Sequence, residues 1–317
     1  MNQLLKDGVS RRTFLAGAGL SAGTAAVATL AAGCGGGSTV TATPGPTSAP
    51  TGITDVDILN FALNLEYLEA EFYQRAVYGS GLSSADIGTS PGAVTGGAQV
   101  SFSTPALAAL AKEIANDELA HVRFLRKALG SAAVDRPAID FTDAFAALGA
   151  AADAGTPGPL IPIPSPFNPF LGEAIFLVGA FTFEDVGVTA YHGAAPLLTN
   201  SGNLAAAAGI LATEGYHAAI LRTALVYLGD PYLSYANDIS KVRAAASTTA
   251  TAGSGAEVAV SGSTIVPADI NSIAFDRTTD QVMRIVYLTP PPSPSVPVAK
   301  GGFFPNGLNG KITATTT

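Results

Sequence analysis

The chain has 317 residues, of which 48 % are apolar and only 13 % are charged, so it is long and apolar enough to bury a large core. Its net charge is −8 and its basic residues are scattered, which excludes nucleic-acid binding through a basic face. With one cysteine, the chain cannot form an intramolecular disulfide.

Residues 1–34 predict an export signal. Arg11 and Arg12 are followed by Phe14, Leu15 and a stretch rich in alanine and glycine, a pattern typical of a twin-arginine signal. The twin-arginine machinery would then export the chain, which would function outside the cytoplasm, in the periplasm or cell envelope. The alternative is one membrane-spanning helix, which the shortage of leucine, isoleucine and phenylalanine in this stretch disfavours.

Cys34 closes this segment and, with residues 30–33 before it, resembles a bacterial lipobox in which the cysteine carries the lipid. A lipid there would be the chain's contact with the membrane. The alternative is an ordinary signal-peptidase site near the same position. Residues 35–52 contain mainly Gly, Ser, Thr and Pro without periodicity, which predicts a flexible linker in either case.

Apolar residues at spacings of three and four predict four long helices in the following part of the chain. In chain order they cover residues 55–78, 104–129, 170–198 and 203–228. Thr54 or Asp55 is the expected N-cap of the first helix. Pro105 in the first turn and Gly130 after the last turn mark the ends of the second.

The connections between these helices differ in length. Residues 130–169 form a long crossing between the second and third helices, with a short helix predicted at 143–152. Two hairpins joined by one long crossover are a known arrangement of four-helix bundles. We therefore predict an all-α bundle over residues 53–240 and an irregular C-terminal extension, residues 241–317, that packs on it.

A Glu-x-x-His motif occurs in the second helix and again in the fourth, as Glu118 with His121 and Glu214 with His217. Three residues turn a helix by about 300°, so both side chains of a pair lie on one face, one turn apart. A carboxylate and an imidazole placed in this way can bind one metal ion together. One such motif is weak evidence, so its surroundings decide how much weight it carries.

The surroundings of the two motifs match at identical spacing. The matching residues are Leu125, Arg126, Ala128 and Leu129 after the first motif, and Leu221, Arg222, Ala224 and Leu225 after the second. In the first helix, Glu66 precedes Tyr73 by seven residues. The same spacing separates Glu184 from Tyr191 in the third helix. The chain therefore reads as a duplicated helical hairpin, in which each half delivers one lone glutamate and one Glu-x-x-His motif to a shared centre.

These features resemble the ferritin-like superfamily and, within it, the desiccation-related ferritin-like proteins of bacteria and plants. The resemblance covers residues 53–230, where Asn64-Leu65-Glu66 is similar to the ligand turn of ferritin's first helix. In the tail, residues 274–278 and 301–307 resemble the desiccation-related subfamily. The resemblance implies a ferritin-like fold and a pair of metal ions held by Glu66, Glu118, His121, Glu184, Glu214 and His217.

Two divalent ions in an apolar bundle need this ligand chemistry. Four carboxylates neutralise the four positive charges, and two neutral imidazoles complete the set while leaving positions open for oxygen or peroxide. We expect two iron ions, with manganese as the alternative, because both metals accept oxygen and nitrogen ligands. Glu69 is the rival of Glu66, one turn away, but its counterpart in the third helix is Gly187, which has no ligand atom.

Other repeated residues are expected to lie around this centre. Tyr73 and Tyr191 are either hydrogen-bond partners of the ligands, redox-active groups or amphipathic core residues near the site, and we favour the last over redox chemistry. Arg126 and Arg222 are expected to complement the dipoles of their helices near the C-terminal ends.

The resemblance implies a site that can bind metal and does not settle the activity. From the six-ligand set and the export signal, we expect an exported metal protein that carries out redox chemistry with oxygen, peroxide or ferrous iron in stress protection. The alternative is a stress- or desiccation-related envelope protein in which the metal site is structural or vestigial. The sequence leaves open the oligomeric state, the reductant and whether the protein is an enzyme.

Overall fold

A computed structural model describes residues 52–154, 162–247, 257–289 and 296–316. Arg11, Arg12 and Cys34 lie outside these residues, so the export signal and the lipidation stay predictions. The described part of the chain is mainly helical, and its sheet consists of two strands of two residues each. The all-α prediction is confirmed.

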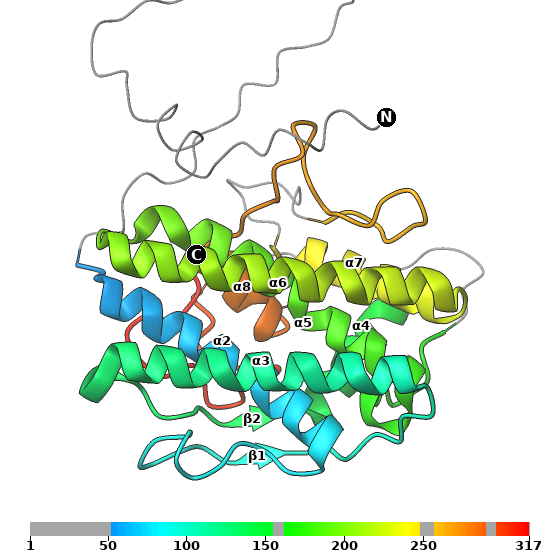
Figure 1. Ribbon diagram of the computed structural model, residues 1–317, viewed down its shortest axis with the longest axis horizontal. Coiled ribbons are helices and arrows are strands. Elements are labelled where there is room, and N and C mark those ends of the chain that lie inside the picture. Colours follow the sequence, from blue (N-terminus) through cyan, green and yellow to red (C-terminus); the bar gives the residue numbers. More distant parts are fainter. Residues whose placement is uncertain (1–51, 155–161, 248–256, 290–295, 317) are drawn as a thin grey trace, which may run out of the picture. The chain divides into compact units, whose positions relative to one another are not determined.

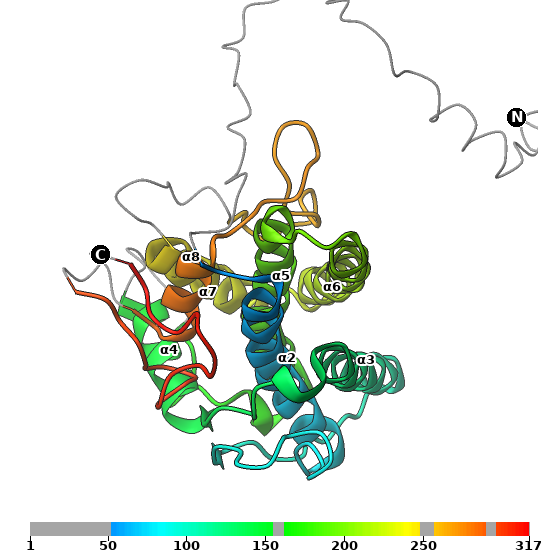
Figure 2. The ribbon, with the colours of Figure 1, turned by 90° about the vertical axis from the view of Figure 1, so that its left-hand side faces the viewer.

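Four long helices form two hairpins (Figure 1). They are α2 (Asp55–Tyr78), α3 (Pro105–Leu129), α5 (Glu173–Ala194) and α6 (Ser201–Leu228). Helix α2 packs along α3 and α5 along α6, while α2 and α5 also contact each other (Figure 2). The long crossover connects α3 to α5, so the predicted four-helix arrangement is confirmed.

The start of α2 is stabilised by an N-cap and by contacts with a neighbouring turn. Thr54 is the N-cap, since its side chain accepts from the backbone of Asp57, whose carboxylate accepts from Thr54 in return. Asp55, the other candidate, instead accepts from the backbone N–H groups of Thr199 and Asn200 at 2.9 and 3.0 Å. Asp55 therefore joins the start of α2 to the turn between α5 and α6.

The crossover contains the short helix α4 (Thr142–Ala154), close to the predicted 143–152. Before it, strand β2 (Ile139–Asp140) pairs in parallel with β1 (Val94–Thr95) from the α2–α3 loop. Two residues are too short to show the alternation of a strand, so this pair escapes prediction from sequence. The pair joins the two long loops of the bundle.

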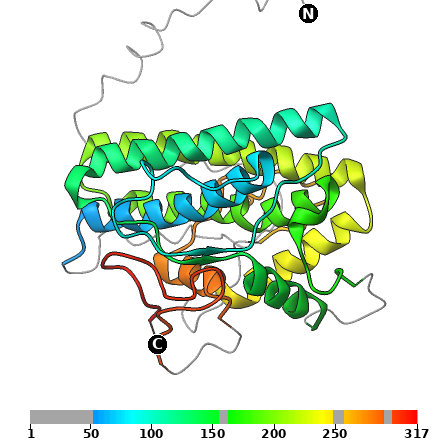
Figure 3. The ribbon, with the colours of Figure 1, turned by 90° about the horizontal axis from the view of Figure 1, so that it is seen from below.

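The C-terminal part contains two helices that were not expected, α7 (Tyr232–Ser247) and α8 (Thr279–Val286). Both pack against α5, and α7 also packs against α4. Helix α7 continues through Ser240, where the predicted bundle ends. Figures 2 and 3 show α4, α7, α8 and the tail on the side of α2 and α5 that faces away from α3.

Two of the described helices, α5 and α6, are long and apolar enough to span a membrane, a property that buried helices of globular proteins share. The apolar window of α5 is 89 % buried, so its composition is explained by its place in the core. The window of α6 is only 33 % buried, yet its two charged residues, Glu214 and Arg222, are both buried. Both charges therefore depend on partners inside the bundle.

Candidate metal centre

The six predicted ligands come from all four bundle helices and converge in the interior. Helix α2 supplies Glu66 and α5 supplies Glu184, while α3 and α6 supply one Glu-x-x-His pair each. The four glutamates are at most 1 % exposed, and His121 and His217 are 9 % and 4 % exposed. The structure brings all six residues together, and their role as metal ligands stays a prediction.

The ligand atoms form two overlapping groups, within each of which all atoms lie within 4.8 Å of one another. The first group is Glu66, Glu118, His121 and Glu214, and the second is Glu118, Glu184, Glu214 and His217. Glu118 and Glu214 belong to both groups. Two carboxylates shared between two sites are what a pair of bridged metal ions requires.

Polar atoms without partners mark this centre. The buried atoms that lack a hydrogen-bond partner here are Glu66 Oε2, Glu118 Oε1, Glu184 Oε2, both carboxylate oxygens of Glu214, and His217 Nδ1. An unpartnered buried polar group costs about 1–3 kcal/mol, so a packed core seldom collects several of them. Cations would satisfy these atoms, and the residues present therefore fit a pair of metal ions.

Tyr73 and Tyr191 connect the two halves of the centre. The hydroxyl of Tyr73 on α2 donates to Glu184 on α5, and the hydroxyl of Tyr191 on α5 donates to Glu66 on α2. Burial, and then the neighbouring carboxylates, raise the pKa of both phenols well above the usual value, so both remain protonated donors. Each tyrosine therefore orients the lone glutamate of the other half.

The two histidines differ on the side that faces away from the centre. Nε2 of His217 lies 3.2 Å from a carboxylate oxygen of Asp117, whose side chain is 42 % exposed. In the repeat, the residue that corresponds to Asp117 is Thr213, directly before Glu214, and it has no carboxylate. A carboxylate behind a metal-binding histidine fixes its ring and tautomer. Asp117 was missed from the sequence, although its place directly before Glu118 was the available signal.

Glu69 is buried beside the six residues but belongs to neither group. Its counterpart Gly187 leaves space that Glu214 occupies: a Cβ atom at Gly187 would lie 2.3 Å from Oε2 of Glu214 and 3.5 Å from Oε1 of Glu69. Burial, and then the charge of Glu118, raise the pKa of Glu69 well above its usual value. The two halves of the centre are therefore alike in their ligands and different at this position.

Protons balance part of the negative charge when no metal is bound. Burial would lower the pKa values of His121 and His217, but the surrounding carboxylates raise them to about 11 and about 12. Nδ1 of His121 lies 3.2 Å from Glu66, and Nδ1 of His217 lies 3.0 Å from Glu118, a charge contact without good hydrogen-bond alignment. Both histidines are therefore cationic without metal, and metal ions would replace their protons.

The two repeated arginines hold their helix hairpins together, and Arg126 is half-buried whereas Arg222 is buried. Arg126 donates to the hydroxyl of Tyr67, the residue after the lone glutamate of α2. Arg222 donates at 2.9 Å to Asp185, the residue after the lone glutamate of α5. The helix-dipole interpretation is wrong for Arg222, which lies outside the last turn of α6 and is fully buried. In each hairpin, the arginine pairs with a residue at the equivalent position.

Asp185 also belongs to a second buried cluster, which we call the arginine network: Asp185, Arg222, Arg243, Glu257 and Arg277. Asp185 accepts from Arg222 and Arg243 at 2.9 and 3.0 Å. Glu257 pairs with Arg243 and Arg277. The three arginines are at most 1 % exposed. The network attaches the C-terminal part of the chain to α5.

Comparisons with known proteins agree with this fold. The chain is 29 % identical over 278 residues to the ferritin-like catalase Nec2 of Nesocodon mauritianus, which covers 81 % of this chain and 84 % of that protein. It is 28 % identical over 274 residues to the desiccation-related protein PCC13-62 of Craterostigma plantagineum, which covers 80 % and 85 %. Residues 54–227, more than half of the chain, match the ferritin-like domain, and the chain belongs to this family.

Proposed function

We propose that this chain is an exported protein that holds two metal ions, iron or alternatively manganese, and uses them in redox chemistry with hydrogen peroxide or oxygen. The observation that carries the proposal is the convergence of six predicted ligands, among whose buried atoms six lack a hydrogen-bond partner. A packed core gains no stability from buried carboxylates gathered around two histidines, because like charges at close range repel.

The residues of the centre have separate tasks in this proposal. Glu118 and Glu214 belong to both groups and would hold both ions. Glu66 and His121 would hold one ion, and Glu184 and His217 would hold the other. Bound iron or manganese would supply the exchange of electrons with the oxygen species. Tyr73 and Tyr191 keep the lone glutamates in position through their hydrogen bonds, and the buried surroundings limit the access of water.

Hydrogen peroxide is the favoured reactant, because the relative from Nesocodon mauritianus is named a catalase. In disproportionation, one peroxide takes up two electrons and two protons to give two waters. A second peroxide gives up two electrons and two protons to become dioxygen. The reaction therefore balances without an outside reductant. Oxidation of ferrous iron by oxygen is the other reaction to test on the same protein.

Export is part of the proposal and is supported by the sequence. Arg11 and Arg12 would direct the folded chain to the twin-arginine machinery, which allows metal to be loaded before export. Cys34 would carry the lipid anchor. Cell fractionation tests both: Arg11→Lys/Arg12→Lys should stay in the cytoplasm, and Cys34→Ser should be released from the membrane. A membrane-bound Cys34→Ser protein would contradict the lipid anchor.

The experiment that tests the function combines elemental analysis of the purified chain with oxygen evolution from hydrogen peroxide. About two irons or manganeses per chain are expected, and Glu118→Ala/Glu214→Ala should lose both metal and turnover. Glu113→Ala is the matched control, because Glu113 lies on the same helix but is exposed. Full turnover by the double variant, or no metal bound after anaerobic loading with ferrous iron, would contradict the proposal.

A second function is favoured by the relative named a desiccation-related protein. In this alternative the metals stabilise the bundle of an envelope protein and catalyse nothing. Chelation would lower the melting temperature under both proposals, so melting alone does not separate them. Loaded protein that melts higher than chelated protein but consumes neither peroxide nor ferrous iron would establish the structural role.

A further inference from the structure

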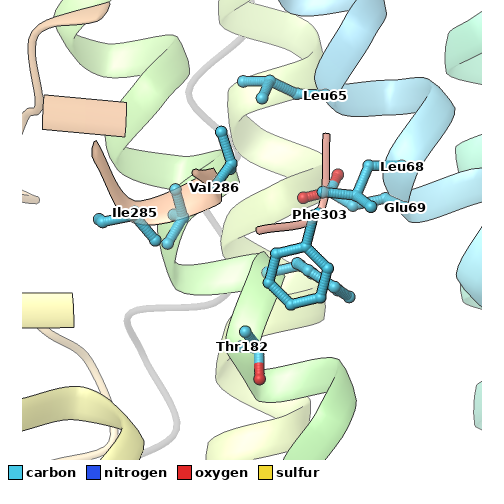
Figure 4. A pocket seen from close by; sticks show the side chains of 10 residues that line it. Leu65, Leu68, Glu69, Thr182, Ile285, Val286 and Phe303 are labelled. Atoms are coloured by element: carbon cyan, nitrogen blue, oxygen red, sulfur yellow. The ribbon is translucent and has the colours of Figure 1, made fainter. Parts of the chain in front are cut away.

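A small cavity lies behind Glu69, on the side of α2 and α5 that faces helix α8 (Figure 4). Its volume is about 20 Å³, counted as the space in which the centre of a water molecule can lie, so it has room for one molecule of this size. Apart from Glu69 and Thr182, its walls are apolar, and every residue that lines it is buried. We call this space the inner cavity.

The inner cavity reaches the metal centre at Glu69 and Gly187, which both line it. Oε2 of Glu214, a predicted bridging ligand, would lie only 2.3 Å from a Cβ atom placed on Gly187. Any side chain at this position would therefore separate the cavity from Glu214. The glycine that breaks the internal repeat is the place where the inner cavity borders the centre.

A larger space, the outer pocket, lies between α4, α5, α7 and α8 and offers about 240 Å³ to the same kind of molecule. Its lining begins at exposed residues such as Ala147 and Ala151. It ends at Thr182, Ile285 and Phe303, which are buried and also line the inner cavity. The two spaces therefore share one wall, and they differ in that the outer pocket is lined partly by exposed residues whereas the inner cavity borders the centre.

Phe303 forms the aromatic part of this shared wall and lies next to Glu69 in Figure 4. Two glycines precede it, Gly301 and Gly302, with φ of +144° and +49°, values that other residues rarely adopt. Its ring lies edge-on to Phe145 and Phe183, with centroids 5.0 Å apart in both cases. The tail segment that resembles the desiccation-related subfamily thus places a ring between the two spaces.

We propose that the outer pocket and the inner cavity form the route of a small uncharged oxygen species to the metal centre, with Phe303 as its barrier. Hydrogen peroxide would enter and dioxygen would leave by this route, an assignment that rests on the proposed function. The walls of the inner cavity are apolar apart from Glu69 and Thr182, so they admit neutral molecules and oppose ions, which would lose their hydration there. The outer pocket is mainly apolar and includes Asp238, Lys241 and Arg243 in its lining. Rotation of the Phe303 ring toward the outer pocket would join the two spaces.

The first test needs no metal. The chain has nine tyrosines and no tryptophan, so Phe303→Trp introduces a single tryptophan at the barrier. Its fluorescence, excited at wavelengths that tyrosine does not absorb, should be quenched by dissolved dioxygen in the chelated protein. Adding Ala147→Phe, which fills the outer pocket, should lower the quenching constant about threefold or more, because a close-packed interior leaves no path. Adding Ala150→Phe, exposed on α4 but outside the pocket, should change nothing. Equal quenching in both double variants would overturn the route.

The second test keeps Phe303 and so does not depend on the folding of Phe303→Trp. In the metal-loaded protein, Ala147→Trp should lower kcat/KM for hydrogen peroxide about tenfold with little change in kcat, because it slows entry and leaves the chemistry unchanged. Ala150→Trp should behave as the unsubstituted protein does. Unchanged kcat/KM in Ala147→Trp would overturn the route and direct attention to the side of α3 and α6, where Asp117 is partly exposed.

The two tests separate the route from the proposed function. If no loaded protein consumes peroxide, the proposed function fails, and the quenching comparison still decides whether the route exists. If the unsubstituted protein consumes peroxide but quenching is the same with Ala147→Phe and Ala150→Phe, the function stands and the route is wrong.

Discussion

Two buried charge clusters meet on helix α5 at adjacent residues. Glu184 belongs to the metal centre, where five buried glutamates, with Glu69 included, surround two histidines. Asp185 belongs to the arginine network, where two carboxylates face three guanidinium groups. Each carboxylate of the network contacts two arginines. The five carboxylates of the metal centre have only two histidines beside them, and six polar atoms there lack a hydrogen-bond partner, against three in the network.

The difference distinguishes a cluster that is complete within the chain from one that requires a ligand. Consecutive residues of a helix point about 100° apart, so adjacent acids can lie in two different environments. An acid surrounded by arginines is neutralised by the chain itself. An acid surrounded by acids and histidines must take up protons or metal ions. Matched substitutions of Glu184 and Asp185 should therefore have opposite consequences for the metal-free protein.

The largest effect on stability is expected from Asp185→Asn. This change removes the carboxylate partner of Arg222 and leaves Arg243 with Glu257 alone, and breaking a buried pair in this way costs about 3–5 kcal/mol. Urea unfolding followed by circular dichroism should show this loss in chelated and in metal-loaded protein. A loss below about 1 kcal/mol would mean that the network is not a main contributor to stability.

Glu184→Gln should have the opposite profile. It removes one negative charge from a crowded cluster and keeps an oxygen that can accept from Tyr73, so chelated protein should be at least as stable as before. Metal affinity should fall roughly 100-fold or more, because even residues behind a ligand contribute about 10–100-fold. Competition with a chelator of known affinity measures it. If Glu184→Gln unfolds as readily as Asp185→Asn, the distinction between the clusters is lost.

The metal centre could be predicted from the sequence because its signal occurs twice. Each predicted ligand of one half has a counterpart at the same spacing in the other half, and the structure brings both sets together. What escaped prediction is what the halves do not share. Asp117 corresponds to Thr213 in the repeat, so only one half has a carboxylate at this position. The inner cavity borders the centre because Gly187 occupies the position that Glu69 has in the first half. Such differences acquire a meaning only when the surrounding space is known.

The fold was predictable where helices are long and periodic. The four bundle helices show apolar residues at spacings of three and four, whereas α8 has only eight residues, too few to establish a period. Its capping box, Thr278 with Gln281, is a sequence sign of a helix start. This sign alone does not predict a helix, because it needs a following apolar run that is long enough to show a period. The burial of Arg243 and Arg277 could not be read from sequence, because arginine is usually exposed and its partners here are distant in the chain.

A smaller effect should separate the two histidines of the metal centre. Asp117→Asn removes the carboxylate behind His217, so the ring loses the partner that fixes its orientation, and metal affinity should fall about tenfold. Thr213→Val, at the position that corresponds to Asp117 in the repeat, is the matched control and should leave the metal affinity unchanged. Chelator competition on both variants measures the ratio. Equal affinities would show that the contact of Asp117 is a surface ion pair without influence on the centre.

The smallest effect concerns the protons that the metal centre carries and the arginine network does not. Burial would lower the pKa values of His121 and His217, but carboxylates raise them to about 11 and about 12, so both are protonated at pH 8. A metal-binding imidazole must be neutral, so loading should release about two protons or more per chain. Burial and then Glu66 raise the pKa of Glu118 to about 7, so about one further proton should appear at pH 6. Anaerobic ferrous titration with a pH dye counts them.

The same protons determine how the stability of the chelated protein depends on pH. A pKa that is higher in the folded than in the unfolded state stabilises the fold below the unfolded pKa, about 6.5 for histidine, and this contribution disappears as the pH rises toward the folded pKa. The melting temperature of chelated protein should therefore decline from pH 6 to pH 9, whereas loaded protein should change less. The arginine network adds no slope there, because guanidinium groups stay charged. Parallel pH profiles for chelated and loaded protein would mean that the histidines are neutral before metal binds and that the centre, like the network, is complete without a ligand.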